Sequence, residues 1–160
     1  KSLTTLLSSI MVEEIIGSDD KVITDVVSDS RKVTTGSLFV AVRGTNVDGH
    51  SFIPLLQYSG VAAIVCEESE TSITYIKVSD SAVALGYLAS EWWDNPSRKL
   101  KLVGVTGTNG KTTTATLIYE MARLMGYKAG LLSTVCNYIE TEAIPTTQTT
   151  PDPLTINALL

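Results

Sequence analysis

The chain has 160 residues, with 12 Lys and Arg against 17 Asp and Glu, a formal net charge of -5 and 44% hydrophobic residues. This apolar content excludes a disordered chain, and the acidic balance argues against a protein that coats nucleic acid, which needs a cationic face. The chain contains no run of about 18 apolar residues, which is the length that a membrane-spanning helix needs. We therefore expect a cytoplasmic protein with neither a nucleic acid nor a membrane as its partner.

The first 93 residues alternate between predicted helices and strands. Helices are expected at residues 2–10, 51–59 and 80–93, and strands at 22–27, 38–42, 61–66 and 75–78. The continuous apolar run at 61–66 is typical of a strand that is covered on both faces. This alternation predicts a small α/β domain with a mostly parallel sheet.

A domain boundary is predicted at residues 96–101, which are polar and basic between two apolar blocks. The boundary divides the chain into residues 1–96 and 97–160. Beyond it we expect a strand at 100–106, a glycine-rich loop at 107–110, a helix at 111–125 ended by Gly126, a strand at 129–135 and a helical segment at 154–160. A nucleotide-binding α/β domain with only about two strands after the boundary cannot cover its own sheet. We therefore expect the truncated beginning of a P-loop-type domain with a parallel sheet.

The clearest motif is Gly-Val-Thr-Gly-Thr-Asn-Gly-Lys-Thr-Thr at residues 104–113. A loop between a strand and a helix directs backbone N–H groups and the helix N-terminus at one spot, which favours phosphate. Gly107 and Gly110 let the backbone approach closely. Lys111 can reach the β- and γ-phosphates of a nucleotide, and the Thr112 hydroxyl suits Mg²⁺.

Val105 stands where the full P-loop pattern has a glycine, so the match covers the second half of that pattern. The alternative is a glycine-rich turn with an exposed lysine. Because the strand, the loop and the helix are in register, we predict ATP or GTP binding and phosphoryl transfer, with Lys111 as the catalytic residue. The predicted ATP-binding residues are Gly107, Thr108, Asn109, Gly110, Lys111, Thr112 and Thr113, with Thr112 as the metal ligand.

This loop, taken as residues 103–114, resembles the ATP loop of the Mur ligases of peptidoglycan synthesis. Three segments upstream of the loop resemble the N-terminal domain of the members that add the third residue or the terminal dipeptide. They are Asp29-Ser30-Arg31, Gly36-Ser37-Leu38-Phe39-Val40-Ala41 and Asp48-Gly49-His50. Residues downstream of the loop are similar to those of the member that adds the third residue, namely Ser133-Thr134-Val135, Asn137 and Thr149-Thr150-Pro151-Asp152.

The resemblance implies an N-terminal domain that binds the UDP end of UDP-MurNAc-L-Ala-D-Glu, and a central domain that binds ATP as co-substrate with Mg²⁺. It implies a monomeric ligase that converts the D-glutamyl carboxylate to an acyl phosphate and joins it to a diamino acid. The implied substrate-binding residues are Ser28, Ser30, Thr45, Asn46, Val47, Gln148, Thr149 and Thr150. The family's later magnesium ligands lie beyond Leu160, so we expect this chain to bind without catalysing.

Two other functions stay open, namely the dipeptide-adding Mur ligase and a P-loop module that binds nucleotide without ligating anything. The alternative for residues 28–31 is a plain turn stabilised by Asp and Ser side chains. In either case Asp29 and Arg31 are expected to form a structural pair and not to contact the substrate. His50 is expected to donate or accept hydrogen bonds at a helix entry. A zinc site is excluded, because neither cysteine has metal-ligand spacing.

Overall fold

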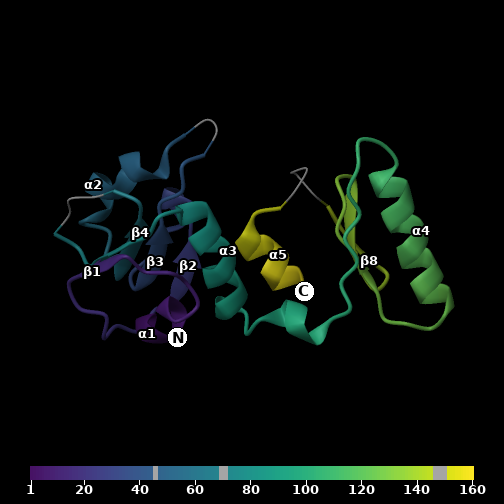
Figure 1. Cartoon of the computed structure of the whole chain (residues 1–160), viewed down its shortest axis with the longest axis horizontal. Helices are drawn as coiled ribbons and strands as arrows, with labels where there is room; N and C mark the ends of the chain where they lie inside the picture. The colour runs from purple at the N-terminus through teal and green to yellow at the C-terminus, as the bar shows by residue number, and fades with distance from the viewer. Residues whose placement is uncertain (45–46, 69–71, 146–150) are drawn as a thin grey trace. The chain divides into compact units, whose positions relative to one another are not determined.

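The computed structural model describes residues 1–44, 47–68, 72–145 and 151–160. These residues form two compact units, Lys1–Pro96 and Ser97–Leu160, each with its own β-sheet (Figure 1). Within the described ranges, no helix is both long and apolar enough to cross a membrane.

The first unit is built on a five-stranded sheet in the order β1-β5-β4-β3-β2. The strands are β1 (Glu14–Ile16), β2 (Asp25–Val27), β3 (Ser37–Val40), β4 (Ala63–Cys66) and β5 (Tyr75–Lys77). β2 to β5 run parallel, and β1 pairs antiparallel with β5. The predicted mostly parallel α/β sheet is confirmed, whereas the edge strand β1 was not predicted.

Three helices pack on this sheet, and a capping side chain explains where two of them begin. They are α1 (Leu3–Leu7), α2 (Ile53–Leu56) and α3 (Ser81–Trp92), and α2 follows the 3-10 helix η2 (Gly49–Phe52). Ser2 accepts a hydrogen bond from the backbone N–H of Thr5, and Asp80 accepts one from that of Val83. Such side chains satisfy N–H groups that the first turn of a helix leaves without a partner.

The core of the first unit lies on both faces of the sheet. One cluster joins the sheet to α2 and contains Val27, Phe39, Ala41, Ile53, Leu56, Val61, Ile64 and Cys66. Because side chains alternate along a strand, Leu38 and Val40 point to the opposite face. Along α3 the buried apolar side chains are those of Ala84, Leu85, Leu88 and Ala89, whereas Val83 is 55% exposed.

The second unit combines a long helix with a small antiparallel sheet. Its elements are η3 (Pro96–Lys99), α4 (Lys111–Leu124), β6 (Gly130–Leu131), β7 (Cys136–Ile139), β8 (Glu142–Pro145) and α5 (Pro153–Leu159). α4 confirms the predicted helix, and Gly126 follows its end with a φ of 83°. α4 lies beside the sheet (Figure 1), where Tyr119 stacks on Tyr138 with ring centroids 5.7 Å apart.

Two strand predictions for the second unit are wrong. Residues 100–106 form no strand, and Leu102 and Val103 are 59% and 67% exposed. An apolar strand is stable only beside neighbours, and the strands of the described residues pair elsewhere. The strand predicted at 129–135 shrinks to Gly130–Leu131, because the chain turns at Ser133 to enter the hairpin of β7 and β8.

Candidate functional site

The glycine-rich loop leads directly into α4. Residues 107–110 form bends, and α4 begins at Lys111 with Gly110 in the N-cap position. Gly110 has a φ of 77°, in the left-handed region, and Gly107 has a φ of 145°. Both conformations favour glycine. The N-cap position offers no side-chain hydrogen bond to the helix, so the first-turn N–H groups stay accessible.

These N–H groups form the main feature of the second unit. In the described part of the chain, no protein acceptor is recorded for the backbone N–H groups of residues 107–113, and the first bond at this helix start is that from Thr114 N to Gly110 O, at 2.9 Å. Most of these residues are exposed. Accessible N–H groups at a helix N-terminus, together with the helix dipole, form a ready anion site.

Lys111 adds a positive charge to this loop. Its Nζ atom donates hydrogen bonds to the carbonyl oxygens of Gly107 at 2.5 Å and Thr108 at 3.3 Å. The side chain therefore folds back over the loop that precedes it. An ammonium group held there can bind a phosphate oxygen at the same place as the N–H groups.

Thr112 faces a second hydroxyl that sequence reasoning did not place in the site. Its Oγ1 atom lies 3.3 Å from Oγ1 of Thr134, which follows β6. The turn that carries Thr134 is fixed by Asn137, whose buried amide oxygen accepts from Ser133 N at 3.1 Å. Asn137 and Ser133-Thr134-Val135 are among the residues that carry the family resemblance, and this was the signal in the sequence for the turn.

The described residues fit a magnesium ion held mainly by oxygen atoms from outside this chain. No group of three or more His, Cys, Asp or Glu side chains within the described ranges could hold a metal. Mg²⁺ keeps several waters and binds through few protein ligands plus substrate phosphates. Thr112 could therefore supply one hydroxyl ligand beside a phosphate held by the loop.

In the first unit, polar residues gather where the parallel strands end. Ser28 and Ser30 follow β2, and Val47, Asp48 and His50 follow β3. Because the carboxyl ends of parallel strands meet at one edge, the structure brings these segments to the same edge of the sheet. Ser28 and Ser30 are half-buried, and Val47 is 57% exposed. The other predicted substrate residues lie outside the described residues, namely Thr45, Asn46, Gln148, Thr149 and Thr150.

Asp29 and Arg31 form the structural pair that was expected. Arg31 donates from Nε and Nη2 to the two carboxylate oxygens of Asp29, at 2.9 and 2.8 Å, and Asp29 also accepts from the Arg31 backbone N–H at 3.0 Å. These bonds cap the 3-10 helix η1 (Ser30–Lys32) and keep the guanidinium engaged. Ser28 and Ser30 flank this fixed turn.

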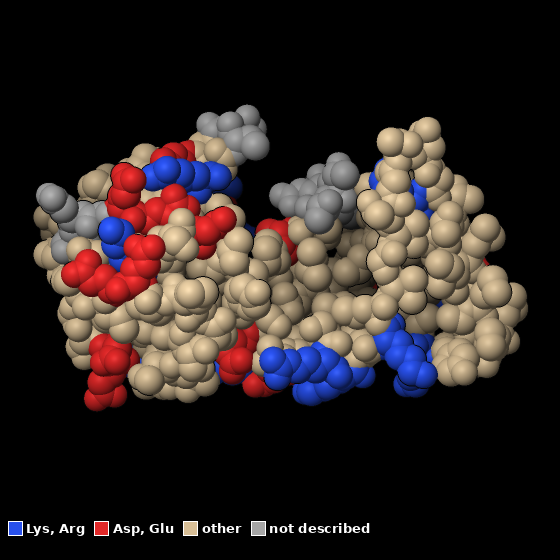
Figure 2. All heavy atoms as spheres, in the orientation of Figure 1, with Lys and Arg blue, Asp and Glu red and all other residues tan. Residues whose placement is uncertain are grey.

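A further cluster at this edge was missed from the sequence. Arg43 Nε lies 3.2 Å from Glu67 Oε2, and Glu67 Oε1 accepts from the backbone N–H and the hydroxyl of Ser81 at 3.1 and 2.9 Å. Figure 2 shows acidic and basic side chains mixed on this part of the molecule. The only signal was that Glu67 follows a buried apolar run.

The hydrogen bonds at this edge lower the pKa of three carboxyl groups. The side chain and then the backbone of Arg31 lower the pKa of Asp29 from 3.8 to about 2. The backbone and side chain of His50 lower the pKa of Asp48, and the backbone N–H of Ser81 lowers that of Glu67. All three groups are therefore charged at neutral pH.

The shift at Asp29 predicts how acid affects the first unit. A lowered folded pKa stabilises the fold above the unfolded value of 3.8, and this contribution is lost as the pH falls from about 4 towards 2. Asp29→Asn should make the free energy of unfolding less dependent on pH within this window. Urea unfolding followed by circular dichroism at several pH values measures this. An unchanged pH dependence would contradict the assigned pair.

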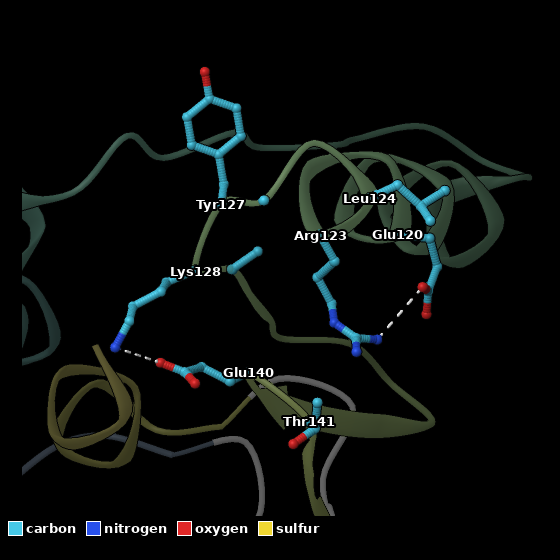
Figure 3. A pocket seen from close by; sticks show the side chains of 9 residues that line it. Glu120, Arg123, Leu124, Tyr127, Lys128, Glu140 and Thr141 are labelled. Carbon is cyan, nitrogen blue, oxygen red and sulfur yellow. Dashed lines mark hydrogen bonds and ion pairs between the residues drawn. The ribbon is translucent and has the colours of Figure 1, made fainter.

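A separate hollow of about 300 Å³ lies at the other end of α4 (Figure 3). Its charged side chains neutralise one another, since Lys128 Nζ lies 3.1 Å from Glu140 Oε1 and Arg123 Nη1 lies 3.5 Å from Glu120 Oε2. Figure 3 shows the two ion pairs among the residues that line the hollow. Because α4 rises about 1.5 Å per residue, this hollow is well away from Lys111 and the glycine-rich loop.

Comparisons with known families match both units. Residues 22–93 match the family model described as "Mur ligase family, catalytic domain", and residues 105–160 match the one described as "Mur ligase middle domain". The chain is similar to the UDP-N-acetylmuramoyl-L-alanyl-D-glutamate--2,6-diaminopimelate ligases of Parabacteroides distasonis and Bacteroides fragilis, at 58% and 54% identity. Each alignment covers 99% of this chain and 33% of the relative, so the chain spans about a third of these relatives.

Two solved ligase structures also align with this chain. A structure of UDP-N-acetylmuramoyl-L-alanyl-D-glutamate--2,6-diaminopimelate ligase aligns with a TM-score of 0.76 over 99% of this chain and 32% of its own, at 22% identity, which shows the fold. The MurF ligase of Thermotoga maritima in complex with ADP aligns with a TM-score of 0.54 at 30% identity, over 83% of this chain and 28% of its own.

Proposed function

This chain belongs to the Mur ligase family, and from that premise we propose that it forms the nucleotide-binding part of an ATP-dependent ligase that adds 2,6-diaminopimelate to UDP-MurNAc-L-Ala-D-Glu. The choice of amino acid rests on the names of relatives with 51% to 58% identity over nearly the whole chain. The dipeptide-adding ligase is less well supported, because its matches are solved structures at 24% to 30% identity over 77% to 83% of this chain, whereas the named diaminopimelate ligases reach 51% to 58% over 99%. ATP as co-substrate is consistent with a cytoplasmic enzyme.

One observation carries the ATP assignment, namely the accessible N–H groups of residues 107–113 with Lys111 above them. In this proposal the N–H groups bind the β- and γ-phosphates, and the Lys111 ammonium neutralises charge that develops on the transferred phosphoryl group. Thr112 supplies a hydroxyl to Mg²⁺, which would offset the charge of the phosphate oxygens when bound. Thr108 and Asn109 form the loop between the two glycines.

The chemistry requires a nucleotide beside a carboxylate. A carboxylate is a poor electrophile until one of its oxygens carries a good leaving group. Transfer of the γ-phosphoryl group from ATP to the D-glutamyl carboxylate gives an acyl phosphate and ADP. Attack by the amine of diaminopimelate then forms the amide and releases phosphate. Lys111 would hold the phosphoryl group during the first step.

We assign the UDP end of the second substrate to the carboxyl edge of the first sheet. Ser28 and Ser30 offer hydroxyl groups beside a rigid turn, and Val47 offers an exposed apolar side chain on the neighbouring segment. Arg31 donates to Asp29 through Nε and Nη2, and we assign most contacts to the diphosphate to hydroxyl and backbone N–H groups. The family resemblance adds Thr45 and Asn46 beside the uracil, and it assigns Gln148, Thr149 and Thr150 to the muramoyl-peptide part of the substrate.

Isothermal titration calorimetry of this chain tests the proposal. UDP and Mg·ATP should each release or absorb heat, and saturation with one should leave binding of the other intact. Cytidine diphosphate, which has the same diphosphate and a different base, should bind more weakly than UDP. No heat with UDP would remove the substrate assignment, and no heat with Mg·ATP would remove the phosphate loop.

A further inference from the structure

The ring of His50 connects two segments at the carboxyl edge of the first sheet. Its Nδ1 atom lies 2.7 Å from Asp48 Oδ1, and its Nε2 atom accepts a hydrogen bond from the backbone N–H of Glu67 at 3.0 Å. Since a backbone N–H can only donate, Nε2 carries no hydrogen, and Nδ1 donates to Asp48. The side chain of His50 is only 12% exposed. Both ring nitrogens are therefore used to fix the ring in place.

The two partners of the ring extend this connection in opposite directions. Asp48 lies at one end of the segment that follows β3, where it forms an isolated bridge with Arg43 at the other end. Glu67 follows β4, and its carboxylate accepts from Ser81 at the start of α3 and pairs with Arg43. Both ends of the segment after β3 are thus attached to Glu67, through His50 on one side and Arg43 on the other.

The backbone beside His50 packs closely against the residues that follow β3. A Cβ atom on Gly49 would lie 2.9 Å from both the backbone N and the backbone O of Val42. Gly49 N also donates to Val42 O at 2.9 Å, and Gly44 N donates to Val47 O at 3.0 Å. Val47, one of the proposed contacts to the uridine end, therefore projects from a segment that is fixed at both ends.

We propose that His50 is a positioning residue for the uridine ligand. It touches no ligand atom, and it acts by holding Asp48, and with it the neighbouring Val47, at the carboxyl edge, so that the ligand does not have to fix Val47 when it binds. Ordering a segment on binding lowers affinity, and a segment fixed beforehand avoids that loss. This inference rests on the proposed function, because it requires UDP to bind at this edge.

Two amide substitutions separate the two hydrogen bonds of the ring. In His50→Gln, the amide oxygen can replace Nε2 as the acceptor for Glu67 N–H. In His50→Asn, the shorter amide can replace Nδ1 as the donor to Asp48 but does not reach Glu67. Tyr58→Asn is a matched control, because it removes an 88% exposed ring from the same unit.

Calorimetric titration with UDP and with Mg·ATP gives the readout, with thermal melting to verify that each variant is folded at the titration temperature. We expect His50→Asn to weaken UDP binding about tenfold, as the loss of one buried hydrogen bond implies. His50→Gln should lose less, and Tyr58→Asn nothing. The affinity for Mg·ATP should be unchanged in all three.

Two results would overturn the inference. Folded His50→Asn with unchanged UDP affinity would show that the ring does not position the segment. Equal losses for UDP and Mg·ATP would show that His50 supports only the stability of the chain. A wild-type chain that binds no UDP would instead overturn the proposed function, and the inference with it.

Discussion

Replacing Lys111 with alanine should reduce ligase turnover on the order of 10³-fold, when the variant is made in a protein as long as the diaminopimelate ligases that this chain matches. This is the cost of removing one group that stabilises charge in a transition state. The reason is positional. Lys111 Nζ lies over the loop, bonded to the carbonyl oxygens of Gly107 and Thr108. Alanine leaves the N–H groups in place but removes the positive charge that the transferred phosphoryl group would meet.

The affinity for UDP should stay unchanged in this variant, since Lys111 belongs to the second unit and the proposed uridine contacts at Ser28, Ser30 and Val47 belong to the first. Steady-state kinetics with UDP-MurNAc-L-Ala-D-Glu, together with UDP titration, measures both quantities. Lys101→Ala is the matched control, because it removes an exposed lysine outside the loop. If Lys111→Ala lost UDP affinity and turnover alike, the two sites would be wrongly assigned.

Replacing Phe39 with alanine should have the largest effect on stability. Phe39 is completely buried in β3, between Val27 of β2 and Ile64 of β4 in the sheet register, and it belongs to the cluster beneath α2. Truncating a buried phenylalanine removes apolar contacts and leaves a cavity, which costs about 3–5 kcal/mol. This is a large part of the stability of an ordinary domain, which is about 5–15 kcal/mol.

Urea unfolding of the chain, followed by tryptophan fluorescence, measures this loss, because both tryptophans lie in the first unit at the end of α3. Phe52→Ala is the control, since that phenylalanine is half-buried and should lose less. Phe39→Leu, which keeps an apolar side chain, should fall between wild type and Phe39→Ala. Equal losses in Phe39→Ala and Phe52→Ala would contradict the central place of Phe39 in the core.

The sequence predicted those parts of the fold in which local signals and packing agree. The apolar run that contains β4 gave a buried strand, and Asp80 and Gly126 mark the start of α3 and the end of α4. The bends of the glycine-rich loop and the helix start at Lys111 were predicted in the same way, because the glycines that shape this turn lie within a few residues of one another. In each of these cases the residues that form the feature are neighbours along the chain.

The missed features depend on residues that are distant in the chain. Glu67 and Ser81 come together only because β4 and the start of α3 meet at one edge. The contact of Thr112 with Thr134 likewise requires β6 to lie beside α4. The strand expected at residues 100–106 failed for the same reason, since an apolar run becomes a strand only when a neighbour pairs with it.

The edge strand β1 has a consequence for the order in which the first unit assembles. Its partner β5 lies far along the chain, and closing so long a loop carries an entropic cost that is smaller once the intervening parallel strands have formed. All three residues of β1 are exposed and recover little of that cost through burial. β1 should therefore join the sheet late in folding and detach first when the protein opens locally, which uncovers the edge of β5 while the buried strands β3 and β4 stay intact.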